Sequence, residues 1–261
     1  MQARPAPSEP SGTPALGPYD VSPRDLPAPA ALPVGTPRIL VLGDSVAAKL
    51  GMAMRHRQTE RRAFVAERGV GDCTILEGEG AAGFTRGASH SCASAWVEDV
   101  RTLRPDRTLV VLGGGYYGRL GTGRSRRAPC DPVFDATYEA RLLELLRAIA
   151  PDAGKLSVAR VPYPVGRWRS PGLLERVDCF NRAVERAAVA ASASIVRLDL
   201  RVCPTPDCVL EEDGAGIRPD GLHFDGVGAE GTARWTLGEL LGPGSGTGGG
   251  ERAAPPASIT P

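Results

Sequence analysis

The chain is poor in lysine, histidine and aromatic residues, and it has no long apolar run. Lysine occurs only at positions 49 and 155, histidine occurs three times, and aromatic residues make up 5% of the 261 residues. Basic residues number 31 against 30 acidic ones, so no electrostatic footprint for nucleic acid is visible. No segment is apolar over a length that could cross a bilayer. No secretory signal is recognisable after Met1, because the following residues are polar and rich in proline. If the protein is exported, we expect its targeting element to lie outside this chain.

Both ends of the chain lack apolar periodicity. Residues 1–36 are rich in proline, alanine and serine, and such a segment cannot bury enough apolar surface to offset the entropy of ordering. Residues 243–261 are rich in glycine and proline and are typical of a flexible tail. The sequence therefore predicts a disordered arm, one domain over residues 37–242, and a disordered tail.

Between these ends, short apolar runs alternate with helical patterns. The strand-like runs cover residues 38–43, 63–70, 108–112, 156–161 and 194–198. The helical patterns cover residues 46–56, 93–103, 134–150, 173–191 and 231–241. The central runs are almost wholly apolar, as buried parallel strands are. This alternation predicts an α/β fold, a three-layer α/β/α sandwich around a central, mainly parallel five-stranded sheet.

Six cysteines allow fifteen pairings, and the sequence alone does not choose among them. The simplest scheme joins neighbours along the chain: Cys73 with Cys92, Cys130 with Cys179, and Cys203 with Cys208. Three bridges would imply an oxidising compartment; the alternative is a cytosolic protein with free thiols. A zinc site needs closely spaced ligand pairs, and the sequence offers none, so we expect no metal.

Ser45 stands where a predicted buried strand gives way to a predicted helix. It follows the run Ile39-Leu40-Val41-Leu42 and the pair Gly43-Asp44. In open α/β sheets, ligands and reactive groups gather at the carboxyl ends of the strands. The hydroxyl of Ser45 is therefore a candidate nucleophile. The alternative is that Ser45 only caps the helix, a common task for serine there.

A second motif, Asp220-Gly221-Leu222-His223-Phe224, precedes the last predicted helix. An imidazole can take the proton of a serine hydroxyl, and a carboxylate can hold the ring in the required tautomer. Of the three histidines, only His223 follows an aspartate by three positions. Asp220 and His223 are therefore the candidate partners of Ser45.

These two motifs together resemble those of the SGNH (GDSL-like) hydrolases, over about residues 38–241. The resemblance implies a flavodoxin-like three-layer fold. It also implies Ser45 as nucleophile, His223 as general base and then general acid, and Asp220 as the residue that orients His223. Enzymes of this family are esterases, lipases, polysaccharide deacetylases and O-acyltransferases, and they use neither a metal nor an organic cofactor.

The resemblance is weaker for the residues that would hold the oxyanion. It implies backbone N–H donors from Ser45 and from a glycine after the second strand, for which Gly71 is the candidate. The family normally has an asparagine after the third strand, and here Gly115 stands in its place. Gly115 could contribute only a backbone N–H, and we expect Gly115→Asn to raise turnover. This departure has two interpretations, a domain that has lost catalysis or a subfamily without the asparagine.

The second interpretation rests on a similarity to extracytoplasmic SGNH domains of actinobacterial membrane acyltransferases. That similarity lies in three segments, Gly71-Asp72-Cys73, Cys130-Asp131-Pro132 and Val161-Pro162-Tyr163. It implies an extracytoplasmic, monomeric acyl-ester hydrolase or O-acyltransferase that moves a small acyl group, acetyl, on a glycan. A membrane acyltransferase would be a partner. The alternative function is a glycan-binding module that has kept the fold and lost the chemistry.

Overall fold

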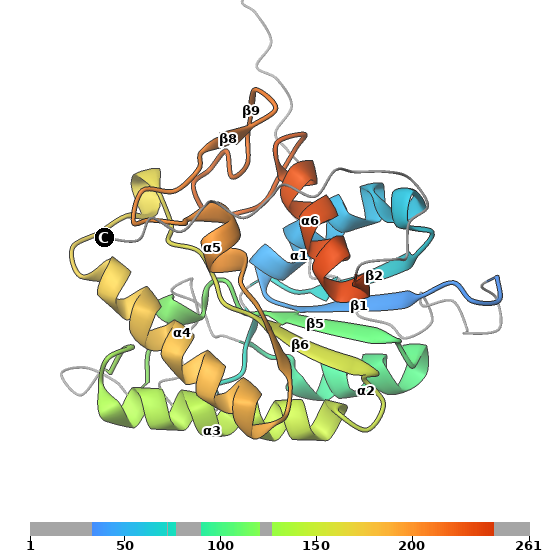
Figure 1. Ribbon diagram of the computed structural model, residues 1–261. Coiled ribbons are helices and arrows are strands. Elements are labelled where there is room, and N and C mark those ends of the chain that lie inside the picture. The colour runs from blue at the N-terminus through green and yellow to red at the C-terminus, as the bar shows by residue number, and fades with distance from the viewer. Residues whose placement is uncertain (1–32, 72, 77–89, 121–126, 243–261) are drawn as a thin grey trace, which may run out of the picture.

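The computed structural model describes residues 33–71, 73–76, 90–120 and 127–242 (Figure 1). Five strands form one parallel sheet in the order β2-β1-β5-β6-β7. These strands are β1 (Arg38–Gly43), β2 (Phe64–Gly69), β5 (Arg107–Val111), β6 (Lys155–Ala159) and β7 (Ser194–Val196). The predicted five-stranded sheet is confirmed, and all of its neighbouring strands are parallel.

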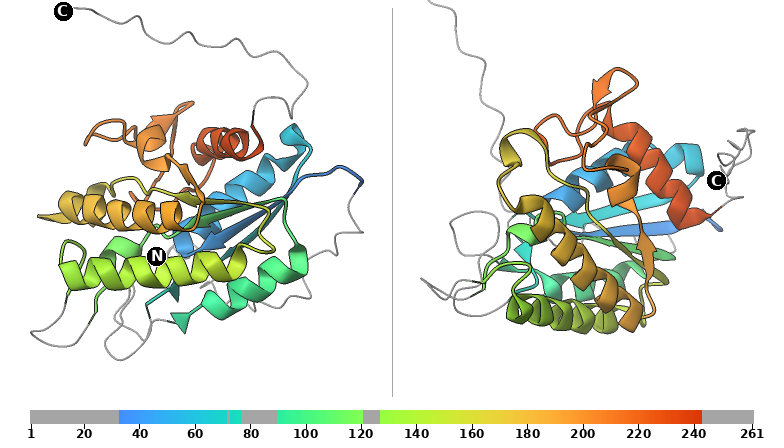
Figure 2. Two further views of the ribbon diagram at one scale, coloured as in Figure 1. Left: turned by 60° about the horizontal axis from the view of Figure 1, so that its bottom comes forward. Right: turned by 60° about the vertical axis from the view of Figure 1, so that its left-hand side comes forward.

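Helices cover both faces of the sheet and make the three layers. Figures 1 and 2 show α1 (Ser45–His56) and α6 (Ala229–Leu241) on one face, and α2 (Ala93–Leu103) and α3 (Pro132–Ile149) on the other. The long helix α4 (Leu173–Ala190) packs against α3, and the short α5 (Leu198–Val202) lies beside α6. Because apolar side chains of β1 meet helices on both faces, residues 39–42 are fully buried.

Small elements connect the main ones, and the sequence analysis did not predict them. Two residue pairs form the parallel bridge of β3 (Cys73–Thr74) with β4 (His90–Ser91). Two more form the antiparallel hairpin of β8 (Glu211–Glu212) and β9 (Ala215–Gly216). Elements of two residues are too short to show a period in the sequence.

Three disulfides join the cysteines as neighbours along the chain. The bonds are Cys73–Cys92, Cys130–Cys179 and Cys203–Cys208. The simplest pairing scheme is thus confirmed, and none of the six cysteines in the described ranges is a free thiol. No helix within the described residues is long and apolar enough to span a membrane. The predicted arm and tail fall outside the described residues, apart from residues 33–36.

Candidate active site

The turn between β1 and α1 places Ser45 at the first position of the helix. Asp44, not Ser45, is the N-cap, because its side-chain Oδ1 accepts the Val46 N–H at 3.0 Å. Gly43 has a φ of +144°, and a Cβ added there would lie 1.8 Å from the carbonyl oxygen of Val111. Glycine is therefore required where the turn passes the end of β5. The capping interpretation of Ser45 is wrong, and its hydroxyl is left for another contact.

That contact is with His223. The Ser45 Oγ lies 2.8 Å from His223 Nε2, and His223 Nδ1 lies 2.7 Å from Asp220 Oδ2. An ionised carboxylate only accepts hydrogen bonds, so Nδ1 carries the ring proton and Nε2 accepts from the Ser45 hydroxyl. The structure therefore brings together all three residues that the two sequence motifs single out, across 178 positions of the chain.

Asp220 is held rigidly by its own loop. Its Oδ1 accepts the backbone N–H groups of Leu222 at 2.9 Å and His223 at 2.8 Å. Burial acts to raise the pKa of Asp220, but the hydrogen bonds from the His223 ring and from the two N–H groups outweigh it, and the pKa lies below its ordinary value. Gly221, at φ +90°, passes so close to the Val165 carbonyl that a Cβ would lie 2.3 Å from its oxygen.

Asp44 joins the loops that follow β1 and β5. Besides capping α1, it accepts the Gly114 N–H on Oδ2 at 2.5 Å, and the residue is 6% exposed. Burial raises the pKa of this carboxyl, although the surrounding backbone N–H groups oppose the shift. Sequence reasoning missed this role. The preference for Asp at N-cap positions could have indicated the capping contact, but not the contact with Gly114.

The three predicted oxyanion donors have different surroundings. Among the described residues, neither the Ser45 nor the Gly71 N–H has a hydrogen-bond acceptor, and a Cβ on Gly71 would meet nothing within 4 Å. Gly71 lies just past Val70, whose N–H bonds to the Gly43 carbonyl at 2.9 Å, so it is near the end of β1. The Gly115 N–H instead donates to the Leu112 carbonyl at 3.1 Å.

Gly115 also has no room for a side chain. An added Cβ would lie 2.4 Å from two ring carbons of Phe180 and 2.7 Å from the Tyr138 hydroxyl. Glycine at this position is thus explained by packing. An asparagine there would collide with the aromatic rings.

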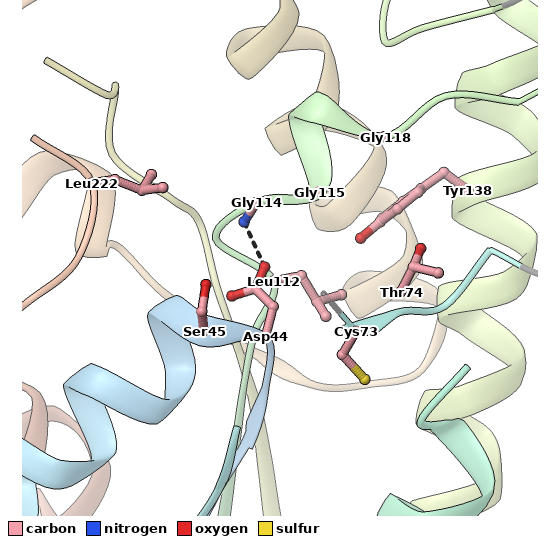
Figure 3. A pocket seen from close by; sticks show the side chains of 10 residues that line it. All are labelled: Asp44, Ser45, Cys73, Thr74, Leu112, Gly114, Gly115, Gly118, Tyr138 and Leu222. Carbon is pink, nitrogen blue, oxygen red and sulfur yellow. Dashed lines mark hydrogen bonds between the residues drawn. The ribbon is translucent and has the colours of Figure 1, made fainter. Parts of the chain in front are cut away.

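Two hollows of different size lie near the three residues, one lined by Ser45 and the other by Asp220. Ser45 and Leu222 line a cavity of about 30 Å³, which Thr74, Leu112, Gly114 and Tyr138 also line (Figure 3). Asp220 and Gly221 lie at a wider groove of about 740 Å³, beside Arg167 and Glu211. Of the two hollows, only the small cavity is lined by Ser45.

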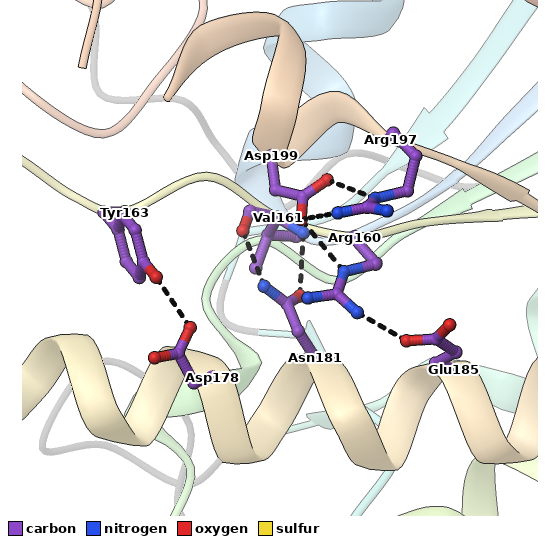
Figure 4. Close-up of polar contacts among 8 residues, drawn as sticks. All are labelled: Arg160, Val161, Tyr163, Asp178, Asn181, Glu185, Arg197 and Asp199. Atoms are coloured by element: carbon purple, nitrogen blue, oxygen red, sulfur yellow. Dashed lines mark hydrogen bonds and ion pairs between the residues drawn. The ribbon is translucent and has the colours of Figure 1, made fainter. Parts of the chain in front are cut away.

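A polar cluster fixes the segment that follows β6 (Figure 4). Asn181 of α4 accepts the Val161 N–H and donates to the Val161 carbonyl, each at 2.9 Å. Arg160 pairs with Glu185 and, at 2.9 Å, with Asp199. These contacts anchor the chain that leads to Val165, whose N–H in turn bonds to the Gly221 carbonyl at 2.9 Å.

The described residues contain no group of three or more His, Cys, Asp or Glu side chains placed to hold a metal ion. That the site works without a metal or an organic cofactor stays a prediction.

Comparison with known proteins gives a match in fold. No family model and no curated protein matches the sequence. Among solved structures, a lipase/acylhydrolase from Enterococcus faecalis is 15% identical, with 78% of this chain and 95% of that chain covered at a TM-score of 0.52. An acetylxylan esterase from Geobacillus stearothermophilus is 17% identical, with 79% and 95% covered at a TM-score of 0.51.

At these identities the likeness establishes the fold. The chain has the same three-layer α/β architecture as these two proteins. Three further structures of the acetylxylan esterase are described as catalytic mutants, in which a serine, an aspartate or a histidine three positions after that aspartate is replaced by alanine.

Proposed function

We propose that this protein is a serine-dependent acyl-ester hydrolase with Ser45, His223 and Asp220 as its catalytic residues. The observation that carries the proposal is the pair of short contacts from Ser45 Oγ to His223 and from His223 to Asp220. The same three residue types, with the same Asp-x-x-His spacing, are those replaced in the catalytic mutants of the acetylxylan esterase.

In the first half of the reaction, Ser45 Oγ attacks the ester carbonyl carbon and His223 Nε2 takes the hydroxyl proton. Asp220 keeps the proton on Nδ1 and stabilises the imidazolium that forms. The tetrahedral intermediate then collapses, the ester C–O bond breaks, and His223 returns its proton to the leaving alcohol. An acyl group remains on Ser45.

The negative charge on the tetrahedral oxygen needs preorganised donors. The Ser45 N–H is one of the unpaired amides at the start of α1, where the helix dipole also favours negative charge. The Gly71 N–H is the second donor that we propose. Gly115 is not a donor in this proposal, because its N–H already bonds to the Leu112 carbonyl. Its lack of a side chain leaves room for Phe180 and Tyr138.

In the second half, a water or an acceptor hydroxyl gives its proton to His223 Nε2 and attacks the acyl carbon on Ser45. The bond from that carbon to Ser45 Oγ breaks, and His223 returns the proton to Oγ. Water gives a hydrolase, and a sugar hydroxyl gives an O-acyltransferase. The small cavity beside Ser45 suits an acetyl group, and the acetylxylan esterase of the same fold acts, by its name, on an acetylated glycan. We therefore propose acetyl esters of glycans as the substrate class.

The three disulfides support an oxidising, extracytoplasmic location. The similarity of three sequence segments to the extracytoplasmic domains of actinobacterial membrane acyltransferases supports a membrane acyltransferase as partner. We propose that this domain is monomeric and acts beside such a partner.

A glycan-binding module without catalysis is the second candidate. The observation that favours it is Gly115, which supplies neither an amide side chain nor an available N–H to an oxyanion. The two candidates differ in whether Ser45 is an activated nucleophile.

An alkyl fluorophosphonate probe separates the two. We expect covalent labelling of the wild-type protein at Ser45, mapped by peptide mass spectrometry, and no labelling of Ser45→Ala or His223→Ala. Ser194→Ala is the matched control, because Ser194 is exposed on β7 and should leave labelling unchanged. A folded wild-type protein that stays unlabelled would overturn the esterase in favour of the binding module.

A further inference from the structure

The side chain of Tyr138 ends inside the small cavity beside Ser45. Tyr138 belongs to α3, on the opposite side of the cavity from α1, and is 1% exposed. Figure 3 shows its ring reaching from α3 toward Gly115 and Leu112, with the hydroxyl as its leading atom. An acyl group on Ser45 that extends into this cavity therefore extends toward the Tyr138 hydroxyl.

The ring of Tyr138 cannot move aside easily. Phe134, one turn earlier on α3, stacks on it with ring centroids 5.9 Å apart. Phe180 of α4 contacts it edge-on at 4.9 Å. The neighbouring disulfide Cys130–Cys179 ties the start of α3 to α4 beside Phe180. A close-packed aromatic cluster of this kind resists displacement by a ligand.

The Tyr138 hydroxyl also occupies space that a side chain at position 115 would need. It lies 2.7 Å from a Cβ built on Gly115. Gly115 thus leaves room for the Tyr138 hydroxyl to stand at the boundary of the cavity. The cavity is small, at about 30 Å³ against about 740 Å³ for the groove at Asp220.

We propose that Tyr138 is the specificity-determining residue that limits the acyl group to two carbons. The proposal rests on the esterase function proposed above. Ser45 and the phenol line the same small cavity, and each methylene added to an acetyl group would have to displace a ring that Phe134 and Phe180 hold in place.

The test is the acyl-chain profile of Tyr138 variants with p-nitrophenyl esters. For each protein, kcat/KM is measured for acetate, propionate, butyrate and octanoate, and the ratio to acetate is reported. This ratio does not depend on the fraction of protein that is folded. In the wild type we expect propionate and butyrate to fall below acetate by about tenfold or more, since one methylene is worth about 10- to 200-fold in a fitted pocket.

Tyr138→Phe removes the hydroxyl oxygen at the end of the cavity. Tyr138→Leu replaces the whole ring with a shorter aliphatic side chain. We expect the propionate ratio to rise in Tyr138→Phe and the butyrate ratio to rise about tenfold in Tyr138→Leu. Leu142→Ala is the matched control, because Leu142 is fully buried one turn later on α3 and does not line the cavity. Its profile should equal that of the wild type.

Two results would overturn the inference while leaving the esterase in place: a wild type that cleaves octanoate as well as acetate, or unchanged ratios in both Tyr138 variants with turnover retained. Absence of Ser45-dependent turnover of every ester would overturn the proposed function itself, and this inference with it.

Discussion

Asp44 and Ser45 are neighbours in the sequence and have separate tasks in the structure. Asp44 caps α1 and bonds to Gly114, so it fixes the backbone on both sides of the cavity. Because Asp44 satisfies the helix start, the Ser45 hydroxyl is available to His223. A serine that served as the cap would instead direct its oxygen to the N–H groups of its own helix.

The first prediction concerns the charge of Asp220. Asp220→Asn keeps the size of the side chain and removes the negative charge that stabilises the imidazolium. We expect kcat for an acetyl ester to fall by a factor on the order of 10⁴, as for the same change in a serine protease. KM should change little, because Asp220 is not expected to touch the substrate.

Steady-state kinetics of the folded variant provides the measurement, with circular dichroism as the check on folding. A loss of less than tenfold would contradict the role given to Asp220.

The second prediction reverses an expectation from the sequence. Because a side chain at position 115 would overlap the Phe180 ring, Gly115→Asn should destabilise the protein and lower turnover instead of raising it. Overpacking of this kind costs about 1–3 kcal/mol of the free energy of unfolding.

Chemical denaturation and ester hydrolysis measure both effects, and Gly238→Ala in α6 is the control, since a Cβ there meets only the Arg61 guanidinium at 3.5 Å. A Gly115→Asn variant as stable as the wild type and more active would restore the original expectation.

At the scale of elements, the sequence predicts the five strands and the long helices to within a few residues. Continuous apolar runs mark buried strands, and the apolar positions of α3 recur every three or four residues. The sequence does not predict α5, the β8–β9 hairpin or the β3–β4 bridge, since each is set by tertiary contacts rather than by a local pattern.

In the candidate site, too, some residues are marked by a local sequence pattern and others are placed only by tertiary contacts. Ser45, His223 and Asp220 lie in local motifs, so sequence finds them. The positions of Tyr138 and Phe180 depend on how α3 and α4 pack against each other. Nothing in the local sequence of either helix indicates that Tyr138 reaches the cavity beside Ser45.

The third prediction concerns the bridge between α3 and α4. Cys130 and Cys179 are 49 positions apart, against 19 for Cys73–Cys92 and 5 for Cys203–Cys208. A longer closed loop constrains the unfolded chain more, so the expected contributions to the free energy of unfolding are about 4, 3 and 2 kcal/mol in the same order.

Three paired Cys→Ala variants test this ranking by urea denaturation. The Cys130→Ala/Cys179→Ala pair should be the least stable, and it should also loosen the packing of Phe180 on Tyr138. The ranking would be contradicted if the Cys203→Ala/Cys208→Ala pair lost the most stability.

At the scale of the whole molecule, ion pairs join elements that are far apart in the sequence. Arginines contact carboxylates across elements, as in Arg38–Asp106 at 3.3 Å and Arg68–Asp99 at 3.4 Å. These two pairs differ in burial. The Asp106 side chain is 44% exposed, whereas that of Asp99 is 1% exposed. The two carboxyl groups should therefore make the stability of the fold depend on pH in opposite directions.

The last prediction follows from Asp99. Its Oδ2 has no partner among the described residues, and burial raises the pKa of Asp99 to about 6, although Arg68 opposes the shift. The folded state therefore binds a proton more tightly than the unfolded chain, whose Asp pKa is about 3.9. Between these two pKa values, the contribution of Asp99 to stability falls as the pH rises.

Asn resembles the protonated form, so Asp99→Asn should match the wild type near pH 4. Above pH 6 it should be more stable, by about 3 kcal/mol from the difference between the two pKa values.

Asp106→Asn is the control of opposite sign. Burial acts to raise the pKa of Asp106, but hydrogen bonds from Arg38 hold it below its ordinary value. That variant should be less stable than the wild type at neutral pH, and the difference should vanish as the pH falls through the folded pKa of Asp106. Urea denaturation at several pH values measures both series. A difference between Asp99→Asn and the wild type that stays constant from pH 4 to pH 7 would show that Asp99 titrates as an ordinary exposed carboxyl.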